Sequence, residues 1–242
     1  MGIYKCSKYM KSTMYGREDY AKEIQKRMIL SFTELIEKRD ANTGKHAKRT
    51  GIYVRILANE LKEQGIYNID EEYVEMISRT APLHDIGKIA ISDTILNKQG
   101  RLTQEEFEKI KEHPLIGIEM LEKIIYNIGE NEYLSFAYDM VLSHHEKWDG
   151  SGYPRGIAGE NIPLSARIMA VADVFDALVS KRCYKEACSY EQAFEIIGNS
   201  SGTHFDPVLV SAFLNRKEEL ESAGEMQEHF ALHTFSKKSV IK

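Results

Sequence analysis

Histidines and aspartates of this 242-residue chain occur in pairs and apolar settings that suit metal binding. His84 precedes Asp85, His144 precedes His145, and Asp173 lies in the almost wholly apolar segment ARIMAVADVFDAL. A carboxylate in such surroundings is expected to be buried, and burying a charge is costly unless the charge is paired or bound to metal. These residues therefore predict a buried metal site.

The types of these ligands indicate which metals and which chemistry to expect. Neutral imidazole with carboxylate, and without thiolate, suits divalent ions such as iron, manganese or zinc. Two such ions that share a carboxylate can generate hydroxide and hold a phosphodiester for in-line attack. His84 and Asp85 can supply a terminal and a bridging ligand, and Lys88, about one helical turn beyond, can neutralise a phosphate oxygen.

Helices are expected to position these residues, because apolar residues recur at helical spacing and no run alternates as a strand would. Capping boxes are predicted at Thr103 with Glu106 and at Ser189 with Gln192. The helices are expected at about 18–38, 45–64 and 104–113, from Asp70, from Pro114, around Leu134 to His145, from Pro163 to about 180, from Ser189 and from Asp206–Pro207. The predicted fold class is all-α.

Two segments, 86–102 and 146–163, interrupt this helical pattern. The second, EKWDGSGYPRGIAGENIP, has four glycines and two prolines in 18 residues, so it is either a simple connection or a functional loop. For the domain organisation we expect a flexible basic N-terminus over 1–17, one catalytic domain over 18–222 and a C-terminal tail over 223–242.

Composition excludes several classes of protein. With 32 basic and 37 acidic residues the net charge is −5, which argues against DNA or RNA polymers as partners. No stretch approaches the roughly 18 consecutive apolar residues of a membrane helix, and no signal-peptide core is present. Cys6, Cys183 and Cys188 form no Cys-x-x-Cys pair and are typical of reduced thiols. We therefore expect a cytoplasmic protein without a transmembrane segment.

Three motifs together resemble the HD-GYP family: HDIGK at 84–88, HHEKWDGSGYP at 144–154 and ADVFDAL at 172–178. This branch of the HD phosphohydrolase superfamily degrades cyclic dinucleotides, chiefly cyclic di-GMP. The resemblance extends over about residues 37–215, with the motifs in family order, which is more specific than a lone His-Asp pair. It implies an HD-type helical bundle around a di-metal site, in a bacterial cytoplasm.

The resemblance also implies roles for the matching residues. One metal would be held by His46, His84, Asp85 and Asp173, and Asp85 would bridge to a second metal held by His113, His144 and His145. Lys88 would contact the scissile phosphate, and Arg182 and Lys185 would hold substrate phosphates. Gly152, Tyr153 and Pro154 would form the name-giving loop, which in the family lies beside the active site and is associated with contacts to partner domains.

The chain departs from the family pattern in two places. Asn42 stands where some relatives have a Glu that binds a third metal, so we expect two divalent ions, with iron or manganese favoured over zinc, nickel or magnesium. Arg182–Cys183–Tyr184 replaces the usual Arg-Pro-Tyr, which could loosen the phosphate contact.

Some assignments remain open from the sequence. Asp176 could bind metal itself, contact substrate or orient a metal-bound histidine. Trp148 and Tyr153 could stack on a guanine or simply pack and hold the loop. His204 and Asp206 are interpreted as helix-capping residues. His229 and His233 are interpreted as surface residues of the tail.

The expected reaction is hydrolysis of cyclic di-GMP by a metal-bridging hydroxide, giving linear pGpG, with further cleavage to GMP left open. The alternatives are a phosphohydrolase for another nucleotide or mixed cyclic dinucleotide, a non-catalytic cyclic dinucleotide sensor that signals through the GYP loop, and an interaction domain with a structural metal. Retention of all seven ligands favours an enzyme. A homodimer is also left open.

Overall fold

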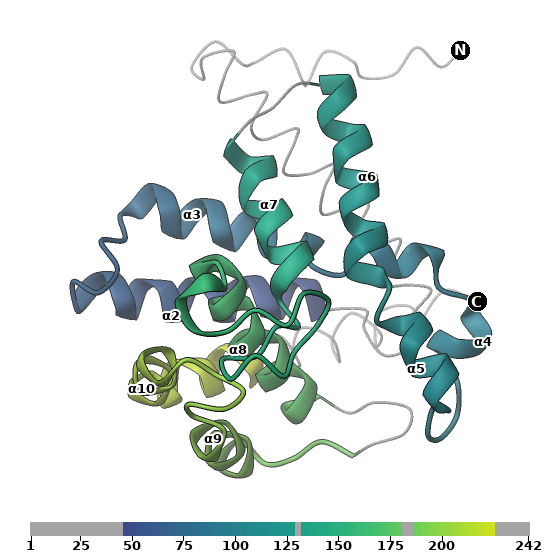
Figure 1. Cartoon of the computed structure of the whole chain (residues 1–242). Helices are drawn as coiled ribbons and strands as arrows, with labels where there is room; N and C mark the ends of the chain where they lie inside the picture. Colours follow the sequence, from purple (N-terminus) through teal and green to yellow (C-terminus); the bar gives the residue numbers. More distant parts are fainter. Residues whose placement is uncertain (1–45, 129–131, 181–185, 226–242) are drawn as a thin grey trace, which may run out of the picture.

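A computed structural model describes residues 46–128, 132–180 and 186–225 of the chain (Figure 1). Every regular element in these ranges is helical, and they contain a single isolated bridge between Ser201 and Phe205. The all-α prediction is therefore confirmed. The elements are α2 His46–Glu63, α3 Glu71–Thr80, η1 Ala81–Leu83, η2 Ile86–Ala90, α4 Asp93–Leu96, α5 Gln104–Ile110, α6 His113–Ile128, α7 Glu132–Ser143, η3 Gly159–Asn161, α8 Leu164–Val179, α9 Tyr190–Asn199 and α10 Pro207–Asn215, and residues 217–225 are also helical.

Local capping signals determine where several helices begin. The Asp70 carboxylate accepts a hydrogen bond from the Tyr73 amide, at 2.8 Å, and starts α3. Both predicted capping boxes are present, at the starts of α5 and α9, and Asp206 caps α10. The helix expected from Pro114 begins one residue earlier, at His113. The helix predicted at 18–38 lies outside the described residues.

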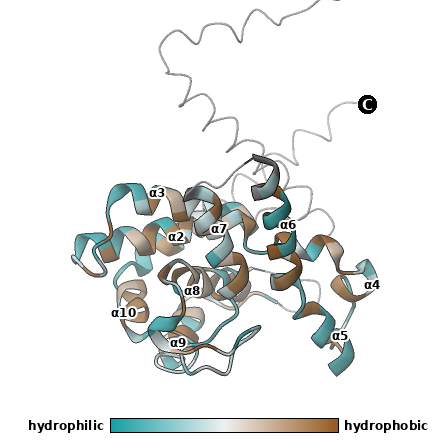
Figure 2. Cartoon of the chain, turned by 45° about the horizontal axis from the view of Figure 1, so that its top comes forward, coloured by the Kyte–Doolittle hydropathy of each residue, from teal (hydrophilic) through white to brown (hydrophobic). Residues whose placement is uncertain are grey.

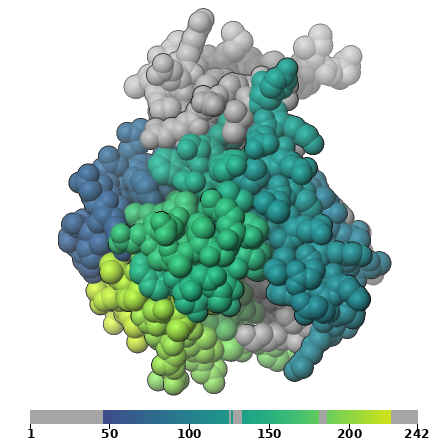
Figure 3. Space-filling view, viewed as in Figure 1, coloured from purple at the N-terminus to yellow at the C-terminus, as the bar shows by residue number. Residues whose placement is uncertain are grey.

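The segment 86–102 is not the continuous loop that the sequence predicted. It contains η2 and the single turn α4, and neither is long enough to produce a recognisable apolar period. The segment 146–163 is a loop apart from the short η3, as predicted. In the space-filling view the part of the chain that follows α7 lies at the centre of the face shown, between α2–α3 and α5 (Figure 3).

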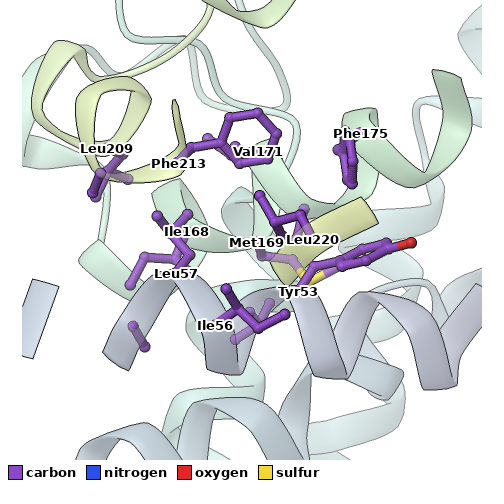
Figure 4. Packing of buried hydrophobic residues seen from close by; sticks show 14 of the residues in the cluster. Tyr53, Ile56, Leu57, Ile168, Met169, Val171, Phe175, Leu209, Phe213 and Leu220 are labelled. Carbon is purple, nitrogen blue, oxygen red and sulfur yellow. The ribbon is translucent and has the colours of Figure 1, made fainter. Parts of the chain in front are cut away.

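Helix α8 lies at the centre of the core. Twelve of its sixteen residues are buried, as expected for a helix that is apolar on all sides, and it packs against α2, α7, α9 and α10. Figure 4 shows this packing for Tyr53, Ile56 and Leu57 of α2, Ile168, Met169, Val171 and Phe175 of α8, and Leu209 and Phe213 of α10. By contrast α5 is largely hydrophilic and has no buried residue (Figure 2).

A second, smaller apolar cluster joins α6 and α7 to η1 and η2. Its buried members are Leu83, Ile86, Ile118, Leu121, Tyr133, Leu134, Ala137 and Val141. The cluster holds η1 and η2 against α6 and α7, so the His84–Asp85 pair between the two short helices is fixed from both sides. Within the described ranges, no helix combines the length and the apolar character that crossing a bilayer would require.

Candidate metal centre

The expected metal ligands come from five parts of the fold that meet at one place. His46 is the first residue of α2, His113 the first of α6, and Asp173 lies within α8. His84 and Asp85 occupy the junction of η1 and η2, and His144 and His145 follow the last turn of α7. Except for Asp173, these ligands lie at helix ends, where the direction of a side chain is not fixed by the helical period.

A glycine allows two of these elements to approach each other. A Cβ atom on Gly87 would lie 1.9 Å from the carbonyl oxygen of His113 and 2.7 Å from the amide nitrogen of Gly117. Since real atoms do not approach so closely, only glycine lets η2 lie directly against the start of α6. This contact brings Asp85 next to His113.

The ligands form two groups. Asp85, His113, His144 and His145 make up the first and His46, His84 and Asp173 the second; within each group the ligand atoms lie within 4.8 Å of one another. Asp85 lies between the groups, because one carboxylate oxygen is 3.2 Å from Nε2 of His113 and the other is 3.2 Å from Nε2 of His84. A single carboxylate can thus serve two ions.

Hydrogen bonds fix the orientation of four of the five imidazoles. Each donates from Nδ1 to an oxygen: His46 to Asp176 Oδ2 at 2.8 Å, His84 to Ala81 O at 2.8 Å, His113 to Ile110 O at 2.7 Å and His144 to Met140 O at 2.9 Å. With the Nδ1 proton committed, a neutral ring presents the lone pair of Nε2 on its other side. Metal-binding histidines are commonly fixed in this way.

The lone pairs face one another across a short gap. Nε2 of His46 lies 3.3 Å from Nε2 of His84, and Nε2 of His113 lies 3.5 Å from Nε2 of His144. Two unprotonated nitrogens at this distance repel unless a proton or a metal cation lies near both. Burial opposes the charged form of His84, but Asp85 and Asp173 raise its pKa to about 9, so without metal a proton occupies this place. In addition, Oδ1 of Asp85 is buried without a hydrogen-bond donor. This donor set fits two divalent cations, one in each group.

The electrostatics keep the carboxylates ionised. Burial alone would raise the pKa of Asp85, but Lys88 and His84 hold it well below its usual range. Burial similarly opposes ionisation of Asp173, whereas His84 and His46 lower its pKa. For His145, burial together with the neighbouring histidines holds the pKa well below 6.5, so its ring is neutral and able to bind metal.

Asp176 lies behind His46. Its buried carboxylate accepts from His46 and also from Arg49, whose Nε lies 2.5 Å and Nη2 2.9 Å away; Nη2 also donates to Ser180. This geometry favours the interpretation that Asp176 orients His46 over the expectation that it contacts substrate. Arg49 was missed from the sequence, although its position three residues after His46 puts both on one helix face.

Lys88 places its ammonium 2.6 Å from Oδ2 of Asp85, with about a fifth of its side chain exposed.

In the GYP loop, the Tyr153 ring stacks on His145, and Tyr153–Pro154 is a cis peptide bond. Trp148 lies near Arg167, whose guanidinium carbon is 5.7 Å from its ring centre. The Tyr153 and Trp148 rings therefore each already contact another side chain, which argues against stacking of a substrate guanine on them. Asn42, Arg182, Lys185, His229 and His233 lie outside the described residues.

Asp206 acts as a helix cap, as predicted from the sequence. It accepts from the Val208 amide at 2.8 Å and pairs with Arg167 at 2.5 Å. His204 stacks on Phe205 and belongs to neither ligand group.

The helical fold and the two groups of potential metal ligands are those expected of an HD protein, and comparison with known families agrees. The profile of the HD domain family matches residues 31–209, and the chain belongs to this family. The HD-GYP assignment made from the motifs is also confirmed.

Three similar proteins illustrate the relationship. A Vibrio cholerae protein named cyclic di-GMP phosphodiesterase is 48% identical over 78% of this chain and 39% of its own length. A second protein from Vibrio cholerae, named 3'3'-cGAMP-specific phosphodiesterase 2, is 38% identical over 82% of this chain and 36% of its own length. The solved structure of an HDG"Y"P protein from Bdellovibrio bacteriovorus has a TM-score of 0.54 at 17% identity, covering 84% of this chain and 63% of that one, and thus shares the fold. The chain spans well under half the length of the two curated relatives.

Proposed function

We propose that this chain is a metal-dependent phosphodiesterase that hydrolyses cyclic di-GMP. The observation that carries the proposal is the pair of ligand groups that meet at Asp85, with the Nε2 atoms of four oriented histidines turned toward them. The names of the relatives support the substrate class, since they include enzymes for cyclic di-GMP and for 3'3'-cGAMP.

The residues fall into three working parts. The first group would hold one cation and the second group the other, and Asp85, which lies between them, would be shared. Two divalent ions supply Lewis acidity toward the phosphodiester and a source of nucleophilic hydroxide at neutral pH. Lys88 is poised to neutralise a phosphate oxygen, and Asp176 with Arg49 keeps His46 in place. Arg182 and Lys185 are proposed to hold substrate phosphates.

Finer expectations belong to the same proposal. The catalytic domain would span 18–222, the ions would be two per chain with iron or manganese favoured, and the setting would be a bacterial cytoplasm. The linear dinucleotide pGpG would be the first product. The GYP loop would also be available to a protein partner. Whether the chain forms a homodimer is tested by measuring its mass in solution.

A turnover assay tests the proposal. The full chain is loaded with Mn(II), or anaerobically with Fe(II), and incubated with cyclic di-GMP or with 3'3'-cGAMP, and the products are separated by chromatography. We expect linear pGpG from the wild type and none from Asp85→Ala. The matched control is Glu195→Ala, an exposed carboxylate of α9 that lies in neither ligand group.

The possible outcomes separate the alternatives. Cleavage confined to 3'3'-cGAMP would replace the substrate and keep the enzyme class. Binding of cyclic di-GMP without cleavage would indicate a sensor. Full turnover by Asp85→Ala would refute the shared role of Asp85. Elemental analysis of protein purified without chelator should give close to two metal ions per chain, and a reproducible three would contradict the argument from Asn42.

A further inference from the structure

His145 differs from the other four imidazoles of the metal centre. No hydrogen bond between its ring and any described residue fixes its orientation, whereas the other four donate from Nδ1 to a protein oxygen. A monodentate ligand that is free to rotate loses rotamer entropy when it binds metal, so an unfixed histidine would weaken the site. Something other than a hydrogen bond must orient this ring.

The Tyr153 ring supplies this orientation. Its centre lies 4.6 Å from that of His145, and the two planes are inclined by only 25°, which is an offset stack. His113 meets the same imidazole edge-on at 5.0 Å, and His144 lies against it at 4.1 Å. The imidazole is therefore enclosed by rings, and Tyr153 is the one of them that belongs to neither ligand group.

The position of Tyr153 is itself determined by the loop. Its amide donates to the carbonyl oxygen of His145 at 3.2 Å, and the Arg155 amide donates to Oε1 of Glu146 at 2.7 Å. A Cβ on Gly152 would lie 2.4 Å from the Lys147 nitrogen, so a residue with a side chain cannot take this place without shifting the loop. These contacts fold the GYP segment back onto the residues that directly follow His144.

Helix α5 adds a contact from outside the loop. The ammonium of Lys111, just beyond α5, lies 5.5 Å from the centre of the Tyr153 ring, within the range of a cation–π interaction. The tyrosine is thus held between the metal centre and the α5–α6 connection.

We propose that Tyr153 is a positioning residue for the metal of the first ligand group: its ring holds the His145 imidazole in the orientation that binds the ion. This inference rests on the proposed function insofar as both require metal at the first ligand group. It assigns the tyrosine of the GYP loop to the metal site and not to stacking on a substrate base. Because stacking requires only an aromatic face, the hydroxyl contributes nothing to this role.

Metal titration tests the inference without any reference to activity. Mn(II) is added to the full chain, and free Mn(II) is followed by electron paramagnetic resonance, which gives stoichiometry and affinity for each site. Tyr153→Leu should weaken one of the two Mn(II) sites at least tenfold and leave the other unchanged, the scale expected when the support of a metal ligand is lost. Tyr153→Phe should stay within about threefold of the wild type, because the stack is retained.

Two controls link the effect to His145. Tyr126→Leu removes a tyrosine that is 90% exposed on α6 and should change neither site. His145→Ala should weaken the same site as Tyr153→Leu, and adding Tyr153→Leu to it should cause no further loss, because the two residues act as one unit. Circular dichroism melting confirms that each variant is folded before the titration.

Unchanged affinities in Tyr153→Leu would overturn the proposal, and so would a Tyr153→Phe loss equal to that of Tyr153→Leu. Additive losses in the double variant would show that Tyr153 acts elsewhere. Cyclic di-GMP turnover by the wild type is measured in parallel. If turnover is absent while the Mn(II) pattern is as expected, the proposed function fails and the positioning role stands.

Discussion

The ammonium of Lys88 lies beside the carboxylate that the two ligand groups share. Its Nζ is 2.6 Å from Oδ2 of Asp85, and it remains partly exposed, so an incoming phosphate can reach it. We expect Lys88→Ala to keep both metals and to lose about 10²–10³-fold in kcat/KM on cyclic di-GMP, the scale of one electrostatic stabiliser. Metal analysis and steady-state kinetics measure this. Lys98→Ala, a lysine paired with Glu106 away from the site, serves as the control.

A Lys88→Ala protein that loses a metal would show that the lysine supports Asp85 instead of contacting substrate. A rate that stays at the wild-type level would show that it does neither.

We expect Asp176 to act on metal binding through His46. Because it accepts the Nδ1 proton of His46, its charge raises the basicity of Nε2 and fixes the ring. Asp176→Asn should weaken the site of His46, His84 and Asp173 by about 10–100-fold, measured by Mn(II) titration. The other site should be unaffected. Asp139→Asn, a carboxyl of α7 that belongs to neither ligand group, is the control, and equal affinities in the two variants would contradict this role.

At the scale of elements, the site depends on how closely η2 and α6 approach. Gly87→Ala would place a methyl group 1.9 Å from the backbone oxygen of His113, and backbone cannot move aside cheaply. We expect this variant to separate Asp85 from His113, to lose metal and to melt at a lower temperature. Gly198→Ala in α9 is the matched control, because its added Cβ would meet only Leu214 at 3.8 Å. That variant should be neutral or slightly more stable.

Wild-type metal content in Gly87→Ala would mean that the backbone can shift without disturbing the ligands, and the argument from close approach would fail.

The elements also show what the sequence could and could not predict. Helices of several turns with a clear N-cap, such as α3 after Asp70 and α9 after Ser189, were predicted because the capping signal is local. The short η2 and α4 were missed because one turn has no period. The ligand residues were identifiable by type and motif, but the contacts of Arg49 with Asp176 and of Tyr153 with His145 depend on tertiary packing that no spacing encodes.

At the scale of the molecule, ligands from His46 to Asp173 span 128 residues of the chain and are brought together by α8, which packs on both α2 and α7. The metal centre is therefore a property of the assembled bundle rather than of one segment. The stability of this bundle depends on contacts that are distant from the candidate metal site. Contacts between the first and last helices of the described domain can be tested without changing any metal ligand.

One such contact joins α2 to α10. Glu60 of α2 accepts hydrogen bonds from Gln64, from Nδ2 of Asn215 at 3.0 Å and from Nε of Arg216. Burial raises the pKa of Glu60, but these bonds outweigh burial and lower the pKa below its ordinary value of 4.5. The folded state therefore binds this proton less readily than the unfolded state, so the stabilisation is complete above pH 4.5 and is lost as the pH falls through the lowered pKa.

We expect Glu60→Gln to lower the free energy of unfolding by about 1 kcal/mol at pH 7, since Arg216 is partly exposed and solvent weakens the pair. That corresponds to about 2–4 °C in Tm for a domain of this size. The difference from wild type should shrink as the pH is lowered from 5 to 3.5. Thermal melts at each pH measure it, with the exposed Glu218→Gln as control. If the Tm difference between wild type and Glu60→Gln stays constant down to pH 3.5, the negative charge of Glu60 does not stabilise the contact between α2 and α10, and the stabilisation comes from packing of the side chain alone.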